Sequence, residues 1–276
     1  MKTFFNFISH KLRILKAVAF VTYKEWSAYR THSMVSIFIG PVYFFVQYCI
    51  WKALYGDSQT LNGMQFSSMM TYFGANALIG YLTMDFADWN LQMLVRTGKF
   101  LTFALRPIHH RFFAFSQKIG HRFLGLVFEF IPCYILFTLL FKVNLVPPEP
   151  LWAVLSIVLG FLMTFYVNYC IGLTAFFFVR AEGVRQVFQL MLTICSGGLL
   201  PLSFFPTVIQ KLLFFLPFQY ILYVPSMVCT GSYNLAGISM GLPQIVGIQA
   251  IAVILTALFS ELLYRLSIKR FTGVGA

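Results

Sequence analysis

Few side chains in this sequence are arranged for chemistry. Gly98-Lys99 is not followed by Ser or Thr and has no upstream glycine at the spacing of a phosphate-binding loop, so no ATP site is predicted. His109 and His110 are adjacent and point in different directions, and with Arg111 they indicate a basic patch rather than a metal site. We therefore predict no catalytic site, no metal ion and no cofactor on this chain.

Two carboxylates lie inside apolar stretches. Glu261 precedes Arg265 by four residues, so an ion pair on one helix face accounts for it. Glu129 lies 12 residues before Phe141, or about 18 Å along a helix, near the middle of its stretch. An unpaired charge there would cost about 2.5 kcal/mol or more in a membrane. Two interpretations stay open: a hydrogen bond between helices beside Pro132, or a role in a transport cavity.

The chain that must position these groups is unusually apolar. Hydrophobic residues make up 59% of the 276 residues and charged residues 10%, and the mean hydropathy is +0.79. A soluble domain has about 45–50% apolar and about 25% charged residues. The composition therefore predicts an all-α integral membrane protein. The cysteines form no CxxC pair and indicate neither a disulfide framework nor a zinc site: Cys49, Cys133, Cys170, Cys195 and Cys229.

Six stretches are long and apolar enough to cross a bilayer, which takes about 20 residues each. They are 33–54, 66–85, 122–141, 151–178, 184–204 and 245–264. Residues 1–32 instead mix apolar and charged side chains, which predicts an amphipathic helix lying on the membrane surface. We expect residues 33–276 to form one six-span domain whose first span serves as the insertion signal, because no cleavable signal peptide is visible.

The distribution of Lys and Arg sets the orientation of these spans. Seventeen of the 20 fall on one side, and Lys52, Lys142 and Lys211 fall on the other. Basic residues concentrate on the cytoplasmic side, so both termini are predicted to be cytoplasmic in a multi-pass protein of the cell inner membrane. The net charge of +12 then reflects topology. We expect contact with membrane lipid and none with nucleic acid.

The long connection after the second span has a pattern of its own. In residues 86–121 aromatic and apolar side chains alternate with polar ones, which suits either a surface helix and loop or a helix offered to a cytoplasmic partner. Asp85 and Asp88 favour a helix N-terminus through the helix dipole. Gly98 can end that helix, and Pro107 marks a later break.

The connection before the last span is the second unusual segment. Its glycines and prolines exclude one straight helix, and they are Gly197, Gly198, Pro201, Pro206, Pro217 and Pro225. The stretches between them are too short to span the membrane yet too apolar for a solvated loop. We expect residues 196–231 to form re-entrant helices in the outer leaflet, between spans five and six.

These features together resemble the ABC-2 type permease family. Arg96-Thr97-Gly98 followed by Leu105-Arg106-Pro107 resembles the R-x-G…L-R-P signature of the branch once catalogued as a domain of unknown function. The region after span five resembles that branch at Pro201-Leu202-Ser203-Phe204-Phe205-Pro206, Leu216-Pro217-Phe218, Pro225 and Gly231. The chain departs from the pattern at Lys99 and Leu101, where many members carry acidic residues.

The resemblance implies a permease subunit of an ATP-binding-cassette exporter. Two permeases, identical or homologous, would form the pathway, and two separate ATPase subunits would carry ATP and Mg and push on residues 86–106. A permease without an ATP site must receive force through such a cytoplasmic surface. Trp89 and Met93, one turn apart, would form its apolar face. The full set expected to contact the ATPase is Asp88, Trp89, Met93, Arg96, Gly98 and Lys99.

Two other classes of protein remain open. An ion-coupled secondary transporter would be expected to show paired repeats and several ionisable groups inside the membrane. A membrane-embedded enzyme would need a catalytic constellation, and the sequence has none. The aromatic content of 18% suits an apolar or amphipathic cargo such as a drug, lipid or peptide, and it suits lipid contact equally well.

Overall fold

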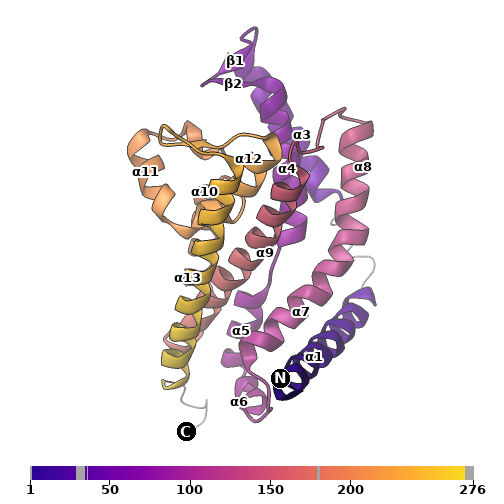
Figure 1. Cartoon of the computed structure of the whole chain (residues 1–276), viewed down its shortest axis with the longest axis vertical. Coiled ribbons are helices and arrows are strands. Elements are labelled where there is room, and N and C mark those ends of the chain that lie inside the picture. Colours follow the sequence, from indigo (N-terminus) through magenta and orange to yellow (C-terminus); the bar gives the residue numbers. More distant parts are fainter. Residues whose placement is uncertain (1, 29–34, 36, 179–180, 271–276) are drawn as a thin grey trace.

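The computed structural model describes residues 2–28, 35, 37–178 and 181–270. It shows an elongated bundle of helices (Figure 1). The predicted end of the surface helix at residue 32, the start of the first span at residue 33, and Arg30 and Arg180 lie outside the described residues.

Three helices of the described residues are long and apolar enough to cross a membrane. They are His110–Leu139, Pro150–Phe176 and Leu242–Ile268. The first consists of α7 (His110–Gly125), a π-helical turn η1 (Leu126–Phe130) and α8 (Ile131–Leu139). The second consists of α9 (Pro150–Gly172) and η2 (Leu173–Phe176). The third is α13 (Leu242–Ile268). Three shorter helices stand where the other spans are predicted: α3 (Ile39–Tyr55), α4 (Phe66–Thr83) and α10 (Ala181–Cys195). The chain is an all-α membrane protein.

The helix that contains most of the third predicted span begins before that span. It starts at His110 and not at residue 122, and its 30 residues extend about 45 Å, whereas a bilayer core is about 30 Å thick. Charged residues of α7 lowered the apparent hydropathy of the segment before residue 122. In the structure several of these charges are buried and paired, as described below.

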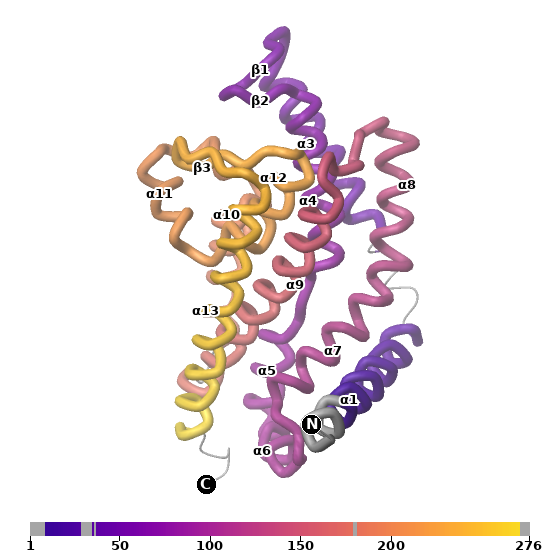
Figure 2. Tube along the Cα trace, in the orientation of Figure 1, coloured from indigo at the N-terminus to yellow at the C-terminus, as the bar shows by residue number. Residues whose placement is uncertain are grey.

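The predicted N-terminal surface helix is present as α1 (Lys2–Ser27). Figure 2 shows it lying alongside α7, and the two helices pack closely. A Cβ at Gly120 of α7 would lie 2.2 Å from the carbonyl oxygen of Ala19, so only glycine allows this approach. Tyr23 meets Phe123 edge-on, with ring centroids 6.1 Å apart. The helix is therefore packed against the bundle along much of its length.

The proline-rich region forms short helices joined by sharp breaks, as its prolines predicted. They are η3 (Leu202–Phe204), α11 (Thr207–Phe215), η4 (Pro217–Tyr220) and α12 (Tyr223–Thr230). Two small hairpins complete this end of the molecule: β1 (Thr60–Leu61) with β2 (Met64–Gln65), and β3 (Asn234–Leu235) with β4 (Ile238–Ser239), both antiparallel. In Figure 1 these elements lie at the end of the bundle opposite α1.

Buried glutamines hold these broken helices to the bundle. Gln249 of α13 is fully buried, and its amide nitrogen donates to the carbonyl oxygens of Ser156 (3.0 Å) and Tyr220 (2.9 Å). The Ser156 hydroxyl donates back to the Gln249 amide oxygen at 2.7 Å. Gln219 is also fully buried and donates to the carbonyl oxygen of Phe214 at 2.7 Å. The Tyr220 and Phe214 carbonyls lie at breaks between helices, so these amides satisfy oxygens that lack a helical partner, as an apolar environment requires.

The first prediction concerns this amide. Gln249→Leu leaves the Tyr220 carbonyl and the Ser156 hydroxyl without their partner, so we expect it to lower the free energy of unfolding in detergent by about 1–3 kcal/mol. Gln59→Leu is the matched control, because Gln59 lies exposed between α3 and β1. Equal melting temperatures for the two variants would contradict the proposed role of Gln249.

Candidate functional site

The segment after α4 forms two short helices joined by a glycine. They are α5 (Ala87–Arg96) and α6 (Lys99–Ala104). The Ala87 amide donates to the Asp85 carboxylate at 3.2 Å, which satisfies the first backbone N–H of α5. Gly98 separates the two helices with φ at +71°, a left-handed conformation that glycine adopts readily. Both the start of α5 and the break at Gly98 agree with the sequence prediction.

The helix α5 has one face in the bundle and one face outside it. Leu91 is fully buried, and at Gly172 of α9 a Cβ would lie 3.1 Å from the Cα of Asp88, so α5 packs tightly on α9. On the other face, 46% of the Trp89 surface is exposed. Arg96 is exposed and pairs with Glu182 at the start of α10, with 3.4 Å between charged atoms.

A groove of about 630 Å³ opens between α5, α6 and α7. Its apolar and basic lining includes Met93, Leu94, Lys99, Phe103, Arg106 and Phe113. Met93 and Lys99, both predicted contact residues, therefore lie in one concave surface, whereas Trp89 stands beside it on the exposed face of α5. Lys99 and Arg106 supply positive charge to the groove, and Phe103 and Phe113 supply apolar surface. A partner that inserts an apolar side chain flanked by acidic groups would fit this lining.

Asp88 lies in the interior, so it is not part of the exposed contact surface in which the sequence analysis placed it. The residue is 2% exposed. One carboxylate oxygen lies 3.5 Å from a guanidinium nitrogen of Arg185 and accepts a hydrogen bond of 3.0 Å from the Gln189 amide. Gln189 also donates to Asn168 at 3.2 Å. Asp88 therefore ties α5 to α10, with α9 beside them.

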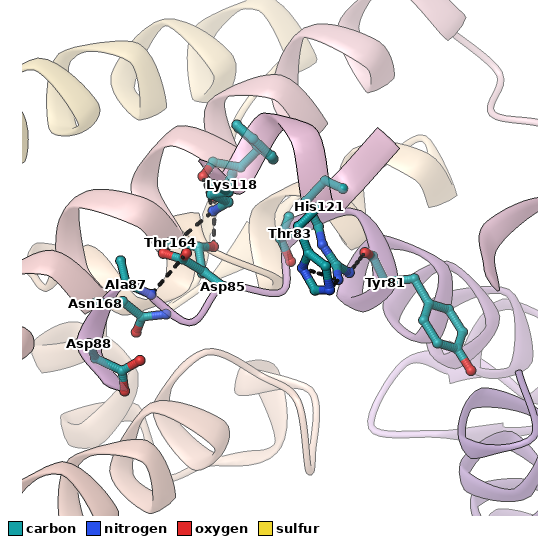
Figure 3. Close-up of polar contacts among 12 residues, drawn as sticks. Tyr81, Thr83, Asp85, Ala87, Asp88, Lys118, His121, Thr164 and Asn168 are labelled. Atoms are coloured by element: carbon teal, nitrogen blue, oxygen red, sulfur yellow. Dashed lines mark hydrogen bonds and ion pairs between the residues drawn. The ribbon is translucent and has the colours of Figure 1, made fainter. Parts of the chain in front are cut away.

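Asp85 makes a second buried ion pair, with Lys118 of α7. Figure 3 shows the two side chains pointing toward one another between the helices. The charged atoms are 3.9 Å apart, and the side chains of Lys118 and Asp85 are 1% and 3% exposed. The Lys118 ammonium also donates to the carbonyl oxygen of Phe161 at 2.8 Å and lies 4.2 Å from the centre of that ring. This pair ties the start of α5 to α7 and α9.

Arg122 and Glu129 form a third buried pair, across the π-helical turn. The charged atoms are 3.5 Å apart. Arg122 also donates to the carbonyl oxygen of Tyr81 at the end of α4, at 2.5 Å, and lies 2.7 Å from a ring nitrogen of His121. Glu129 therefore has a partner on its own helix, seven residues away, rather than only on a neighbouring helix. This pair shows neither the predicted hydrogen bond between helices nor a role in transport, and both stay predictions.

Glu261 closes the network at the end of α13. Its pair with Arg265 has the predicted i, i+4 geometry at 2.8 Å. Arg111 of α7 lies 3.0 Å away, and His109 lies 3.8 Å away. Partial burial lowers the pKa of His109, while Glu261 opposes that shift. Arg111 is therefore the main interhelical cation for this carboxylate.

The sequence analysis missed the pattern that joins these pairs. Arg111, Lys118, Arg122 and Glu129 are spaced by seven, four and seven residues, so they form one stripe along the helix from α7 to η1. Each has an opposite charge within 4 Å in the structure. The helical spacing of these charges could have indicated the stripe. The basic residues were used only to predict the orientation of the spans in the membrane.

The predicted outer region is joined to α3 and α4 through its glycines. Gly197 has φ at +85° and ends α10. Its carbonyl oxygen accepts hydrogen bonds from the Tyr72 hydroxyl (2.7 Å) and the Asn76 amide (3.0 Å), and the Tyr43 hydroxyl donates to the Gly198 carbonyl. Pro201 and Pro206 precede η3 and α11, Pro217 begins η4, and Pro225 lies in the first turn of α12. These prolines start helices rather than interrupt them.

Comparison with known proteins identifies the family of most of the chain. Residues 42–275 match the family model described as "ABC-2 family transporter protein". No curated protein and no solved structure matches. The matched range includes α5, α6, the groove and the three buried ion pairs around them, and it leaves out α1.

The second prediction tests the pair across the π-helical turn. Glu129→Gln leaves the buried Arg122 charge without its counterion, so we expect the free energy of unfolding in mixed detergent micelles to fall by about 3 kcal/mol. Arg122→Gln with Glu129→Gln removes both charges and should lose less than the sum of the single changes. Glu25→Gln, on the exposed side of α1, is the control. Additive losses would show that the two charges do not stabilise one another.

Proposed function

Because this chain belongs to the ABC-2 transporter family, we propose that it is the permease subunit of an ATP-binding-cassette exporter. In this proposal two permeases form the pathway across the cell inner membrane. Two separate ATPase subunits hold ATP and Mg²⁺ and dock from the cytoplasm. The observation that carries the proposal is the family match over residues 42–275, which spans the bundle and the α5–α6 unit at one end of it.

The α5–α6 unit is the surface on which we place the ATPase. It offers an exposed aromatic side chain, Trp89, beside a groove that contains Met93 and Lys99. Aromatic anchors that fit a pocket on a partner dominate the energy of such contacts. Buried ion pairs connect the start of α5 to the bundle, so a displacement of α5 by an ATPase bound at Trp89 would be transmitted to the membrane helices.

Six spans with both termini in the cytoplasm agree with the arrangement of the helices. The three shorter helices, of 17, 18 and 15 residues, extend about 22–27 Å, close to the thickness of a bilayer core of about 30 Å. In Figure 1 the elements α1, α5, α6 and the end of α13 gather at one end of the bundle. We take this end as cytoplasmic and place the re-entrant helices of residues 196–231 in the outer leaflet.

A second permease is expected to pack against α10. Among the described residues of this helix, Ala181 alone is buried. Its uncovered side carries apolar residues such as Val187 and Leu190 together with the polar residues Gln186 and Thr193. Polar side chains in the middle of a span are more stable against another helix than against lipid. An identical or homologous copy of this chain is the occupant that we propose.

One observation favours the alternative, an ion-coupled secondary transporter. Such a protein is expected to carry several ionisable groups inside the membrane, and the described structure buries Asp85, Lys118, Arg122 and Glu129. Each of these groups lies within 4 Å of an opposite charge, which suits a structural role as well. Purification separates the two functions, since a permease of this family should bring an ATPase subunit with it.

The third prediction concerns orientation. In intact cells a membrane-impermeant thiol reagent should label a cysteine at Asp57 or at Val146, and it should not label one at Thr97, although all three positions are exposed in the structure. The variants need a background in which the exposed native Cys49 is replaced. Labelling at Thr97 without labelling at the other two positions would reverse the topology.

The fourth prediction tests the ATPase contact. Trp89→Ala removes the exposed anchor, and we expect the permease–ATPase affinity to fall about thirtyfold, or about 2 kcal/mol, so that the ATPase is lost on purification. Lys99→Ala, at the edge of the same surface, should change the affinity much less. Since Trp89 is half exposed, its loss should leave the permease folded. A Trp89→Ala complex that purifies intact and hydrolyses ATP normally would overturn the assignment.

A further inference from the structure

We propose that two buried carboxylates connect α5 to two different parts of the membrane bundle. Asp85 connects it to the long helix α7–α8 through Lys118, and Asp88 connects it to α10 through Arg185. This inference rests on the proposed function, in which the ATPase moves α5. A displacement of α5 is then transmitted to two helices, and it reaches each helix through a separate ion pair.

The connection to α7 depends on the cost of separating two charges in an apolar interior. Asp85 is bound to α5 because one carboxylate oxygen accepts the Ala87 amide hydrogen at 3.2 Å. The other oxygen is the one that faces Lys118, and it has no hydrogen-bond partner among the described residues. Both side chains are almost fully buried, so moving one charge without the other would leave each without compensation. A displacement of the first turn of α5 therefore carries Lys118 and α7 with it.

The connection to α10 has a different geometry. Asp88 lies on the first turn of α5 and contacts two successive turns of α10, at Arg185 and at Gln189. The ion pair is 3.5 Å long and the hydrogen bond from Gln189 is 3.0 Å long. Two contacts one turn apart fix the rotation of α10 as well as its distance from α5. The same movement of α5 thus reaches α10 by a route that does not involve Lys118.

The helix α9 provides the fixed support between the two connections. Its Gly172 lies so close to α5 that a Cβ there would be 3.1 Å from the Cα of Asp88. The carbonyl oxygen of Phe161 on α9 accepts from Lys118, and Asn168 of α9 accepts from Gln189. Each connection therefore includes one contact to α9, which keeps α7 and α10 in register with the helix on which α5 rests.

The division of the two routes can be measured without knowing the transported substrate. The probe is the labelling rate of a reporter cysteine in the full permease–ATPase complex, with native cysteines replaced by alanine, compared with and without ATP plus vanadate. Leu139→Cys reports on the end of α8, and Leu199→Cys reports on the segment after α10; the native side chains are 74% and 56% exposed. In the parent complex both rates should change on adding nucleotide.

The two Asn variants should then affect different reporters. Asp85→Asn should abolish the nucleotide response of the reporter at 139 and leave the response at 199. Asp88→Asn should do the reverse. Asp57→Asn, at an exposed position between α3 and β1, is the matched control and should change neither response. If either Asn variant silences both reporters together, or if both variants leave the two responses intact, the division of the routes is overturned.

Two further outcomes keep the test decisive. If Asp88→Asn does not assemble, the exchanged pair Asp88→Arg with Arg185→Asp replaces it and is read at 199; if Asp85→Asn does not assemble, Asp85→Lys with Lys118→Asp replaces it and is read at 139. A preserved response at the matching reporter supports the inference, and a lost response with an intact complex overturns it. If no ATPase accompanies the parent permease, or if nucleotide changes neither reporter in the parent complex, the proposed function fails and the inference fails with it.

Discussion

A charge buried among apolar helices has to keep its counterion close, and α7 carries two such cations, Lys118 and Arg122, together with the partly exposed Arg111. Arg111, Lys118 and Arg122 reach carboxylates on α13, on the segment between α4 and α5, and on the following π-helical turn. Losing a counterion in such a site costs several kcal/mol. The relative positions of α4, α5, α7 and α13 therefore depend on these pairs as much as on the packing of apolar side chains.

The same constraint applies to backbone groups at the opposite end of the molecule. Prolines and glycines break residues 196–231 into short helices, and each break leaves carbonyl oxygens without a helical partner. Gln249, Gln219, Tyr72 and Asn76 donate hydrogen bonds to such oxygens. Polar side chains thus fix the irregular ends of the bundle, and apolar side chains fill the regular part between them.

Local features of the fold could be predicted from the sequence, whereas the partners of its charges could not. Hydropathy predicted a helical membrane protein. Asp85 predicted where α5 starts, and Gly98 predicted the break after it. Both features depend on residues that are neighbours in the sequence. Asp88 was misplaced on the exposed face because its partner Arg185 is distant in sequence. The start of the third long helix at His110 was not predicted, because the charged residues before residue 122 lower the hydropathy of that segment.

In the proposed mechanism α5 moves with the membrane helices because buried ion pairs hold it to them. Structures of the permease–ATPase complex with and without bound nucleotide test this most directly. We expect α5 to shift on nucleotide binding while the Asp85–Lys118 and Asp88–Arg185 distances stay within about 4 Å, the range of an ion pair. A shift of α5 that breaks both pairs and leaves α7 and α10 in place would contradict it.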